Sequence, residues 1–234
     1  LYINSLSAGI GSNDIGLDRG QLGDERVVYF SKAGGKLLLI QPNLKYRATT
    51  DNALEKQSVK EAFAESVLFG FPIVETSPSH YLIEITPFLM QDTHGISQRL
   101  KRSKQGNYKL DKSRSAVSLD RTKAFPKNIE LDVLLTFAGE ASGSWIRSVT
   151  PSSNSVSVKQ HHSFVALPEI PFTPRKFDPR SGAIPFSYYD YSTPVETSTR
   201  KVYALRHRLE KTDPNAAQSK AKEPIVYYLS LIHI

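Results

Sequence analysis

The alternation of apolar and polar residues over 128–137 constrains the fold more than any other stretch of the chain. Its apolar members fall on one side of an extended segment: Ile129, Leu131, Val133, Leu135 and Phe137. Successive side chains of a strand point to opposite faces, so the pattern predicts a strand with one buried face. Similar patterns predict strands over 81–86, 155–167 and 200–210, and a short one over 145–149.

Two short apolar runs, 26–30 and 36–41, flank a five-residue loop that contains Gly34 and Gly35. Such a loop is typical of a β-hairpin. Both runs are apolar at consecutive positions, so we expect other elements to cover both faces of the pair.

The segment 52–69 has the clearest helical pattern. Apolar residues recur in it at three- and four-residue spacing: Val59, Ala62, Phe63 and Val67. Asn52 followed by Glu55 has the form of a capping box, and Gly70 and Pro72 are residues that end helices. We expect this helix to dock on a sheet through its apolar face.

The expected fold class is therefore α+β: a predominantly antiparallel β-sheet, one clear amphipathic helix at about 52–69, and long ordered loops. The chain has 234 residues, of which 39% are hydrophobic, which is enough for a sizeable core. No apolar run is long enough to span a bilayer. The absence of cysteine excludes disulfides, a cysteine nucleophile and thiolate zinc sites.

The net charge of +7 is concentrated in one segment. Residues 99–127 contain ten Lys and Arg and two Asp, so this segment alone carries the excess. Nucleic-acid binding would need stacking aromatic residues or a known module beside the charge, and neither is present. We expect a solvated or interdomain loop and no nucleic-acid partner.

Five of the thirteen glycines lie within 4–23. Gly9 and Gly11 suggest a phosphate-binding loop, but no Gly-Lys-Ser/Thr and no helical pattern follows. We expect a long, ordered surface loop.

Two pairs of residues suggest metal binding. Asp92 and His94 have no third ligand nearby in sequence, so a structural or solvent role is favoured. His161 and His162 are adjacent in a predicted strand and point to opposite faces, so they cannot reach one ion without a bulge. We expect His162 to be a hydrogen-bonded, partly buried residue on the Val158 face.

Prolines and aromatic residues interleave over 168–194, which predicts an extended, packed connection. Contact of its aromatic residues with carbohydrate or peptide is the less favoured alternative. Within it, Asp178 and Pro179 predict a turn.

No residue is assigned a catalytic, cofactor-binding or metal-binding role. None of the six histidines is followed by Glu or by a second His four residues on, so the H-E-x-x-H motif is absent. No G-x-S-x-G elbow is present, and no Ser, His and Asp have a local triad signature. We expect this chain to be catalytically inert by itself.

The glycine-rich run Ser7-Ala-Gly-Ile-Gly-Ser-Asn-Asp-Ile-Gly-Leu-Asp-Arg-Gly-Gln-Leu-Gly23 resembles the amino-terminal region of bacterial met-zincin-type zinc-dependent metallopeptidases, a region itself labelled a domain of unknown function. The resemblance continues over 41–48, 109–115, 123–128, 160–164, 177–182 and 206–211. It covers nearly the whole chain.

The resemblance implies a non-catalytic amino-terminal region of a secreted or periplasmic hydrolase, with a folding, shielding or substrate-access role. Its implied partners are its own downstream catalytic domain and a protein or peptide substrate. Zinc is implied for the full-length parent only. The alternative is a free-standing β-rich binding or scaffold module of the cell envelope, with a carbohydrate or protein partner.

The expected domain organisation follows the same resemblance. Residues 1–210 form the β-rich non-catalytic domain, 211–222 a linker, and 223–229 the first strand leading to a missing catalytic domain. The tail 230–234 departs from the family and is expected to be foreign sequence.

Overall fold

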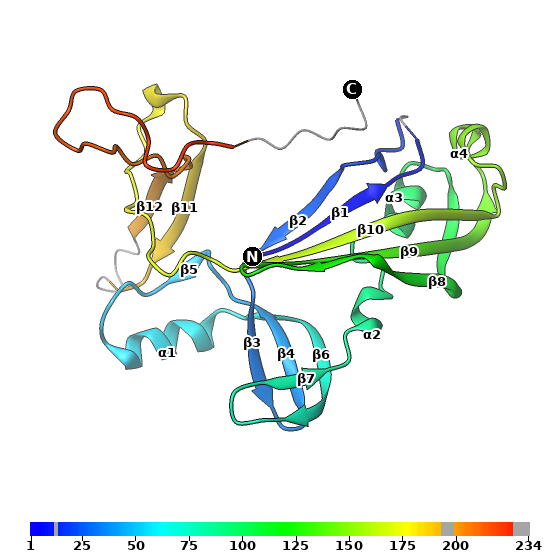
Figure 1. The fold of residues 1–234 in the computed structure, drawn as a ribbon, viewed down its shortest axis with the longest axis horizontal. Coiled ribbons are helices and arrows are strands. Elements are labelled where there is room, and N and C mark those ends of the chain that lie inside the picture. The colour runs from blue at the N-terminus through cyan, green and yellow to red at the C-terminus, as the bar shows by residue number, and fades with distance from the viewer. Residues whose placement is uncertain (12–13, 193–198, 227–234) are drawn as a thin grey trace. The chain divides into compact units, whose positions relative to one another are not determined.

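A computed structural model describes residues 1–11, 14–192 and 199–226 (Figure 1). The chain divides into two compact units. The first comprises Leu1–Pro42 and Glu65–Leu167, and the second Asn43–Ala64 and Pro168–Ile234.

A five-stranded antiparallel sheet runs through the first unit in the order β2-β1-β10-β9-β8. Its strands are β1 (Tyr2–Ala8), β2 (Leu22–Arg26), β8 (Gly106–Ala124), β9 (Asn128–Ala141) and β10 (Ser155–Val165). β9 and β10 pair without a register shift from Ser155 opposite Ala138 to Val165 opposite Asn128. The strands predicted over 128–137 and 155–167 are confirmed.

A four-stranded antiparallel sheet in the same unit has the order β3-β4-β6-β7. Its strands are β3 (Tyr29–Ala33), β4 (Lys36–Gln41), β6 (Ser66–Thr76) and β7 (Tyr81–Ile83). Because Ala33 pairs with Lys36, the turn of the predicted hairpin consists of Gly34 and Gly35 alone. The hairpin is confirmed with a tighter turn than expected.

Two clusters of buried side chains fill the first unit. The first cluster packs inward residues of β1 and β9, such as Leu6 and Leu135, against Ile96 and Leu100 of helix α3 (Ile96–Arg102). The second cluster joins the two sheets through Tyr2, Leu39, Phe71, Leu131 and Phe88 of helix α2 (Thr86–Leu89). The alternation of β9 therefore supplies both clusters from one strand face.

The second unit contains a three-stranded sheet in the order β12-β11-β5. β11 (Pro185–Asp190) pairs antiparallel with β12 (Thr199–Ala204) and parallel with the two-residue β5 (Tyr46–Arg47). Helix α1 (Ala53–Ala62) and the short 3-10 helix η1 (Pro179–Ser181) belong to the same unit.

The predicted fold class, α+β with one clear helix, was wrong. The protein is mainly β, with 45% of its residues in strands of three mostly antiparallel sheets and 14% in helices. The described residues contain four short α-helices, the remaining one being α4 (Ser144–Val149). The antiparallel pairing itself was predicted correctly.

The helix predicted at 52–69 ends at Ala62, and none of its residues is buried. Asn52 caps it as expected, because its side chain accepts a hydrogen bond from the backbone N–H of Leu54 at 3.0 Å. Residues from Ser66 on form β6 and pair with β4, so that Phe69 lies opposite Leu39. Sheet pairing buries this apolar run better than the fourth and fifth turns of an exposed helix would.

The basic segment was also predicted incorrectly. Most of 99–127 is β8, an edge strand of 19 residues, and not a loop. Tyr108 belongs to the first cluster and Leu110 packs against it, whereas Lys109 between them and the other lysines and arginines of β8 are exposed. An edge strand tolerates this charge because one side is unpaired, and charge there discourages pairing with another chain.

Three other predicted strands differ from the structure in type or in length. Residues 145–149 form α4 instead of a strand. The strand at 81–86 stops at Ile83, because Pro87 lies in the first turn of α2. The strand at 200–210 stops at Ala204.

The glycine-rich stretch is only partly a loop. Residues 4–8 belong to β1, inside the five-stranded sheet, and 22–23 to β2. Between them, Gly9 has no room for a side chain, since a Cβ there would overlap the Leu17 carbonyl oxygen. This glycine permits close backbone approach.

The domain boundaries at 210 and 222 stay predictions. In the predicted linker, Lys211 and Ala221 form an antiparallel bridge. Of the strand predicted over 223–229, residues 223–226 are not in a strand, and the rest lies outside the described residues, as does the tail 230–234. None of the helices in the described residues has the length and apolar character needed to cross a membrane.

The close approach at Gly9 gives a stability prediction. Gly9→Ala should lower the free energy of unfolding by about 1–3 kcal/mol, the usual cost of overpacking, because its Cβ meets backbone that cannot move aside. Gly35→Ala is the matched control, since nothing lies within 4 Å of its Cβ position. Urea unfolding of both variants measures the difference, and equal midpoints would contradict the prediction.

Candidate functional site

A group of charged and hydroxyl side chains lies on the face of the five-stranded sheet opposite the apolar clusters. The alternation that buries Leu131 and Val133 turns Glu130 and Asp132 to this face. Across the register, His161 lies opposite Asp132 and Ser163 opposite Glu130. We name the whole group the ion cluster: Ser7, Arg121, Asn128, Glu130, Asp132, His161 and Ser163.

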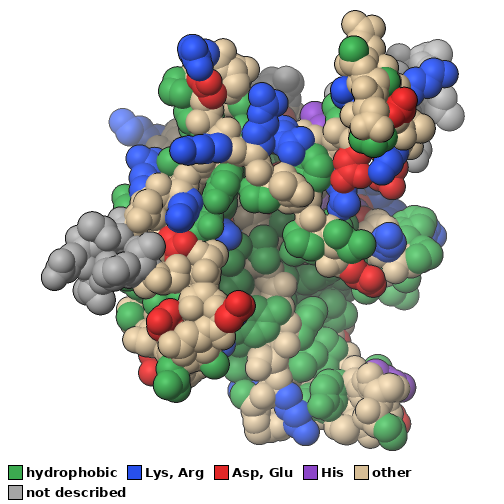
Figure 2. Space-filling model, turned by 90° about the vertical axis from the view of Figure 1, so that its left-hand side faces the viewer, with side chains coloured by type: hydrophobic (Ala, Val, Ile, Leu, Met, Phe, Trp, Pro, Cys, Tyr) green, Lys and Arg blue, Asp and Glu red, His purple; other side chains and the backbone are tan. Residues whose placement is uncertain are grey.

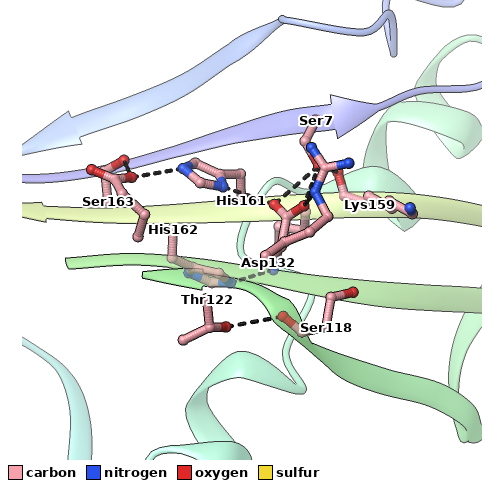
Figure 3. A network of polar contacts seen from close by, with 11 residues as sticks. Ser7, Ser118, Thr122, Asp132, Lys159, His161, His162 and Ser163 are labelled. Atoms are coloured by element: carbon pink, nitrogen blue, oxygen red, sulfur yellow. Dashed lines mark hydrogen bonds and ion pairs between the residues drawn. The ribbon is translucent and has the colours of Figure 1, made fainter. Parts of the chain in front are cut away.

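Asp132 is the most enclosed member, with a side chain that is 1% exposed. Both of its carboxylate oxygens accept from the Ser7 hydroxyl at 3.0 Å. The carboxylate also lies 2.7 Å from His161 Nδ1 and 2.7 Å from Arg121 Nε. Figure 3 shows Ser7, Asp132 and His161 converging from three different strands. Asp132 thus connects β1, β8, β9 and β10.

Glu130 holds the other side of the imidazole. Its Oε2 lies 2.7 Å from His161 Nε2 and also accepts from the Ser163 hydroxyl. Its Oε1 accepts from Asn128 Nδ2 at 2.6 Å. The His161 ring is therefore bound by a carboxylate at each nitrogen.

These contacts set the charges. The hydrogen bond to Asp132 raises the pKa of His161 above its ordinary value, and Glu130 adds to the rise while burial opposes it. Burial by itself would raise the pKa values of Asp132 and Glu130, but hydrogen bonds, chiefly from His161 and Ser7 to Asp132 and from Ser163 to Glu130, lower both overall. Two carboxylates are thus balanced by one guanidinium and one imidazolium.

The ion cluster contains the residue types of a hydrolytic triad without its bonding. In a triad, one imidazole nitrogen binds the carboxylate and the other receives the proton of the serine hydroxyl. Here His161 Nε2 faces Glu130, and the hydroxyls of Ser7 and Ser163 donate to carboxylates. Neither serine is activated, so the arrangement stabilises the sheet and does not generate a nucleophile.

The ion cluster is not arranged to bind a metal ion either. An imidazolium with both N–H groups bound to carboxylates has no lone pair for a metal. In the described part of the chain, no group of three or more His, Cys, Asp and Glu side chains is arranged to hold a metal ion.

His162 lies on the opposite side of β10, among the apolar clusters, and is fully buried (Figure 3). Gln160 Oε1 accepts from the backbone N–H of His94 at 3.0 Å, so Gln160 Nε2 is the group that faces both the Gln91 carbonyl and His162 Nε2, each at 3.0 Å. Since an amide nitrogen only donates, His162 Nε2 accepts and Nδ1 carries the proton. Nδ1 then donates to the Tyr2 hydroxyl at 2.9 Å.

This network keeps His162 neutral. Burial lowers its pKa to about 4, and the neighbouring positive charge of His161 acts in the same direction. The expectation that the two histidines face opposite ways, with His162 hydrogen-bonded, is confirmed, but His162 is fully buried instead of partly buried.

The remaining candidates have structural roles. Asp92 caps α3 by accepting from the backbone N–H groups of Ile96 at 2.7 Å and Ser97 at 2.9 Å. Asp178 caps its own turn by accepting from Arg180 N at 2.9 Å, as predicted. Gly9 and Gly11 precede no helix, so they do not form a phosphate-binding loop.

The aromatic residues of 168–194 pack within the second unit. Tyr189 stacks at 5.7 Å on Tyr46, which in turn stacks on Phe63 at 4.1 Å. The Arg206 guanidinium lies 3.9 Å from the ring centre of Phe172. These contacts bear out the predicted packing only in part, because most side chains of 168–186 are exposed. Residues 193–194 of the predicted connection lie outside the described residues.

An open hollow of about 430 Å³ in the first unit is lined mainly by apolar side chains. Among them Phe30, Phe125, Ile129 and Leu167 are each about half exposed. Hydrophobic side chains also reach the surface elsewhere, between scattered lysines and arginines on the face drawn in Figure 2.

Sequence reasoning missed that Asp132 and Glu130 bind the His161 ring. It also missed Ser7 and Arg121, which bind Asp132. The signal available was the polar side of the alternation over 128–137, which places Glu130 and Asp132 on one face. What was lacking was strand order, since β1 and β8 come from segments that had been predicted to be loops.

Removing Asp132 tests the structural role of the ion cluster. Asp132→Ala leaves Arg121 and His161 without their shared anion, so the free energy of unfolding should fall by about 3–5 kcal/mol, as for other broken buried pairs. Asp120→Ala is the matched control, because this exposed carboxylate lies outside the cluster and its loss should matter by less than about 0.5 kcal/mol. Equal effects in thermal or urea unfolding would contradict the role.

The two histidines should titrate differently. In NMR titrations, the pKa of His161 should lie above its ordinary value, and His162 should stay neutral down to a pH of about 4. A raised folded-state pKa adds stability that is full below the unfolded value, about 6.5, and is lost as pH rises through the folded value. Stability should therefore fall at alkaline pH more in the wild type than in His161→Gln. Protonation of His162 near neutral pH would contradict the network.

Comparison with known proteins identifies a family and no characterised relative. Neither the curated proteins nor the solved structures include a match to this chain. The family described as a domain of unknown function, DUF5117, matches residues 20–212. Because this match spans most of the chain, the protein belongs to the DUF5117 family.

Proposed function

We propose that this chain is the non-catalytic amino-terminal region of a secreted or periplasmic bacterial zinc-dependent metallopeptidase. Its role is to help fold, shield or give substrate access to a catalytic domain that follows it. The partners are that catalytic domain and the parent's protein or peptide substrate. The zinc ion and its ligands belong to the parent's catalytic domain and not to this chain.

The support for the peptidase part is the resemblance carried by short motifs. Six of the seven matching stretches, from 41–48 to 206–211, lie inside the DUF5117 match, whereas the glycine-rich run lies mostly before it. Apart from that run, the resemblance and the family match cover the same part of the chain.

The observation that carries the non-catalytic part is the geometry at His161. This histidine, with Asp132 and two serines in the same cluster, is the arrangement nearest to a hydrolytic site. Glu130 lies 2.7 Å from His161 Nε2 and occupies the nitrogen that a serine would need. A histidine in this state cannot accept a proton from a hydroxyl. These groups hold strands together instead of performing chemistry.

A second candidate is a free-standing β-rich binding or scaffold module of the cell envelope. The hollow lined by Phe30, Phe125, Ile129 and Leu167 favours it, because exposed apolar surfaces of this kind mark interaction sites. A carbohydrate or protein partner would then bind without a downstream catalytic domain.

The coding sequence downstream of residue 229 separates the two candidates. We expect an in-frame H-E-x-x-H-x-x-G-x-x-H motif there, and residues 230–234 to be absent from the genomic reading frame. The full-length parent should cleave peptides in a zinc-dependent manner, and deletion of 1–210 should lower either its folded yield or its activity on protein substrates. The parent carrying Asp120→Ala serves as the control and should keep the yield and activity of the unaltered parent. A reading frame that reaches its stop codon without encoding the motif would overturn the peptidase proposal.

A further inference from the structure

The core side of β1 carries polar atoms that the rest of the protein does not satisfy. Five buried side-chain atoms have no hydrogen-bond partner among the described residues, and four of them belong to three residues: Asn4 Oδ1, Asn4 Nδ2, Thr93 Oγ1 and His94 Nδ1; the fifth is Asp18 Oδ1. Asn4 is 1% exposed, so water at the molecular surface does not reach it. Buried polar groups in folded proteins almost always have a partner, either protein or internal water.

Two of these atoms, Asn4 Oδ1 and His94 Nδ1, lie close together. A Cβ on Gly23 of β2 would overlap Asn4 Oδ1 and would lie 3.0 Å from His94 Nδ1, so both atoms face the same glycine. Thr93 precedes His94 in the chain and lies near the Tyr2 hydroxyl. Burial raises the pKa of Tyr2, and the Thr93 side chain partly offsets this rise. Thr93 Oγ1 nevertheless makes no hydrogen bond of good geometry. The space between these atoms is thus defined by Asn4 of β1, Gly23 of β2 and the segment before α3.

Every charged group around His94 is directed elsewhere. The Asp92 carboxylate accepts from Ile96 and Ser97 at the start of α3. Asp24 binds Arg26, and Arg99 Nε donates to the Ile15 carbonyl at 2.7 Å. Burial lowers the pKa of His94, with smaller opposing effects from Asp92 and Asp24. The groups that face the space are therefore neutral.

We propose that this space binds an internal water molecule that bridges Asn4, Thr93 and His94. The water donates to Asn4 Oδ1 and to His94 Nδ1, and it accepts from Thr93 Oγ1. A water has the two donors and two acceptor positions that such neutral groups require. A divalent cation is a poorer ligand here, because no carboxylate offsets its charge.

The water site lies where the two apolar clusters meet. Along β1, Tyr2 belongs to the second cluster and Leu6 to the first, with Asn4 between them. Gln160 already ties this boundary to the backbone of residues 91 and 94. The bound water adds a link from β1 to the same segment.

Water cross-relaxation in NMR tests the proposal on the wild-type protein. We expect rotating-frame cross-peaks between a long-lived water and the Asn4 side-chain amide, with a further peak to the Thr93 hydroxyl or the His94 ring. A water peak in a high-resolution crystal structure, within hydrogen-bond distance of Asn4 Oδ1 and His94 Nδ1, would support it independently. Absence of both signals overturns the proposal, as does a through-bond coupling that shows Asn4 Nδ2 donating directly to His94 Nδ1.

Two variants and a control locate the signal. Gly23→Ala places a methyl group against Asn4 Oδ1, and Asn4→Leu removes two of the four polar atoms; each should abolish the cross-peaks. Gly35→Ala, whose Cβ meets nothing within 4 Å, should retain them. Cross-peaks that persist in both site variants would overturn the assignment. If either variant fails to fold, the wild-type measurement decides alone.

Discussion

The unbroken pairing of β9 with β10 is the interaction on which the first unit depends. It sets His161 opposite Asp132 and His162 opposite Leu131, and thereby fixes both faces of the sheet at once. A slip of one residue would bring Asp132 into the apolar clusters and turn Leu131 outward. The charged face and the apolar face each disfavour such a slip, so both specify the register of β9 and β10.

The adjacent histidines show how position decides protonation. Carboxylates at both nitrogens hold His161 in its charged form, whereas burial beside Gln160 and Tyr2 holds His162 neutral. The two rings are one residue apart and differ only in the face of the strand from which they project. Neither ring is exposed enough, or free enough at its nitrogens, to serve as a general base.

The sequence predicted what depends on local pattern and missed what depends on distant partners. Alternation located β9 and separated His161 from His162, and Gly34 with Gly35 located a hairpin. The run from Val67 to Phe69 fits a helix face and a strand equally well, and only its pairing with β4 decides between them. β8 was hidden by its charge, because charge is typical of loops but an edge strand also tolerates it. Arg121 therefore could not be connected with Asp132 before strand order was known.

One hydrogen bond separates a structural cluster from a catalytic one here. Serine, histidine and aspartate meet on adjacent strands, and a search for residue types alone would mark them as a triad. The difference is that Glu130, two residues before Asp132 on the same face of β9, occupies the nitrogen that a serine would need. The same alternation that builds the sheet therefore supplies the carboxylate that occupies His161 Nε2 and leaves no base for a serine.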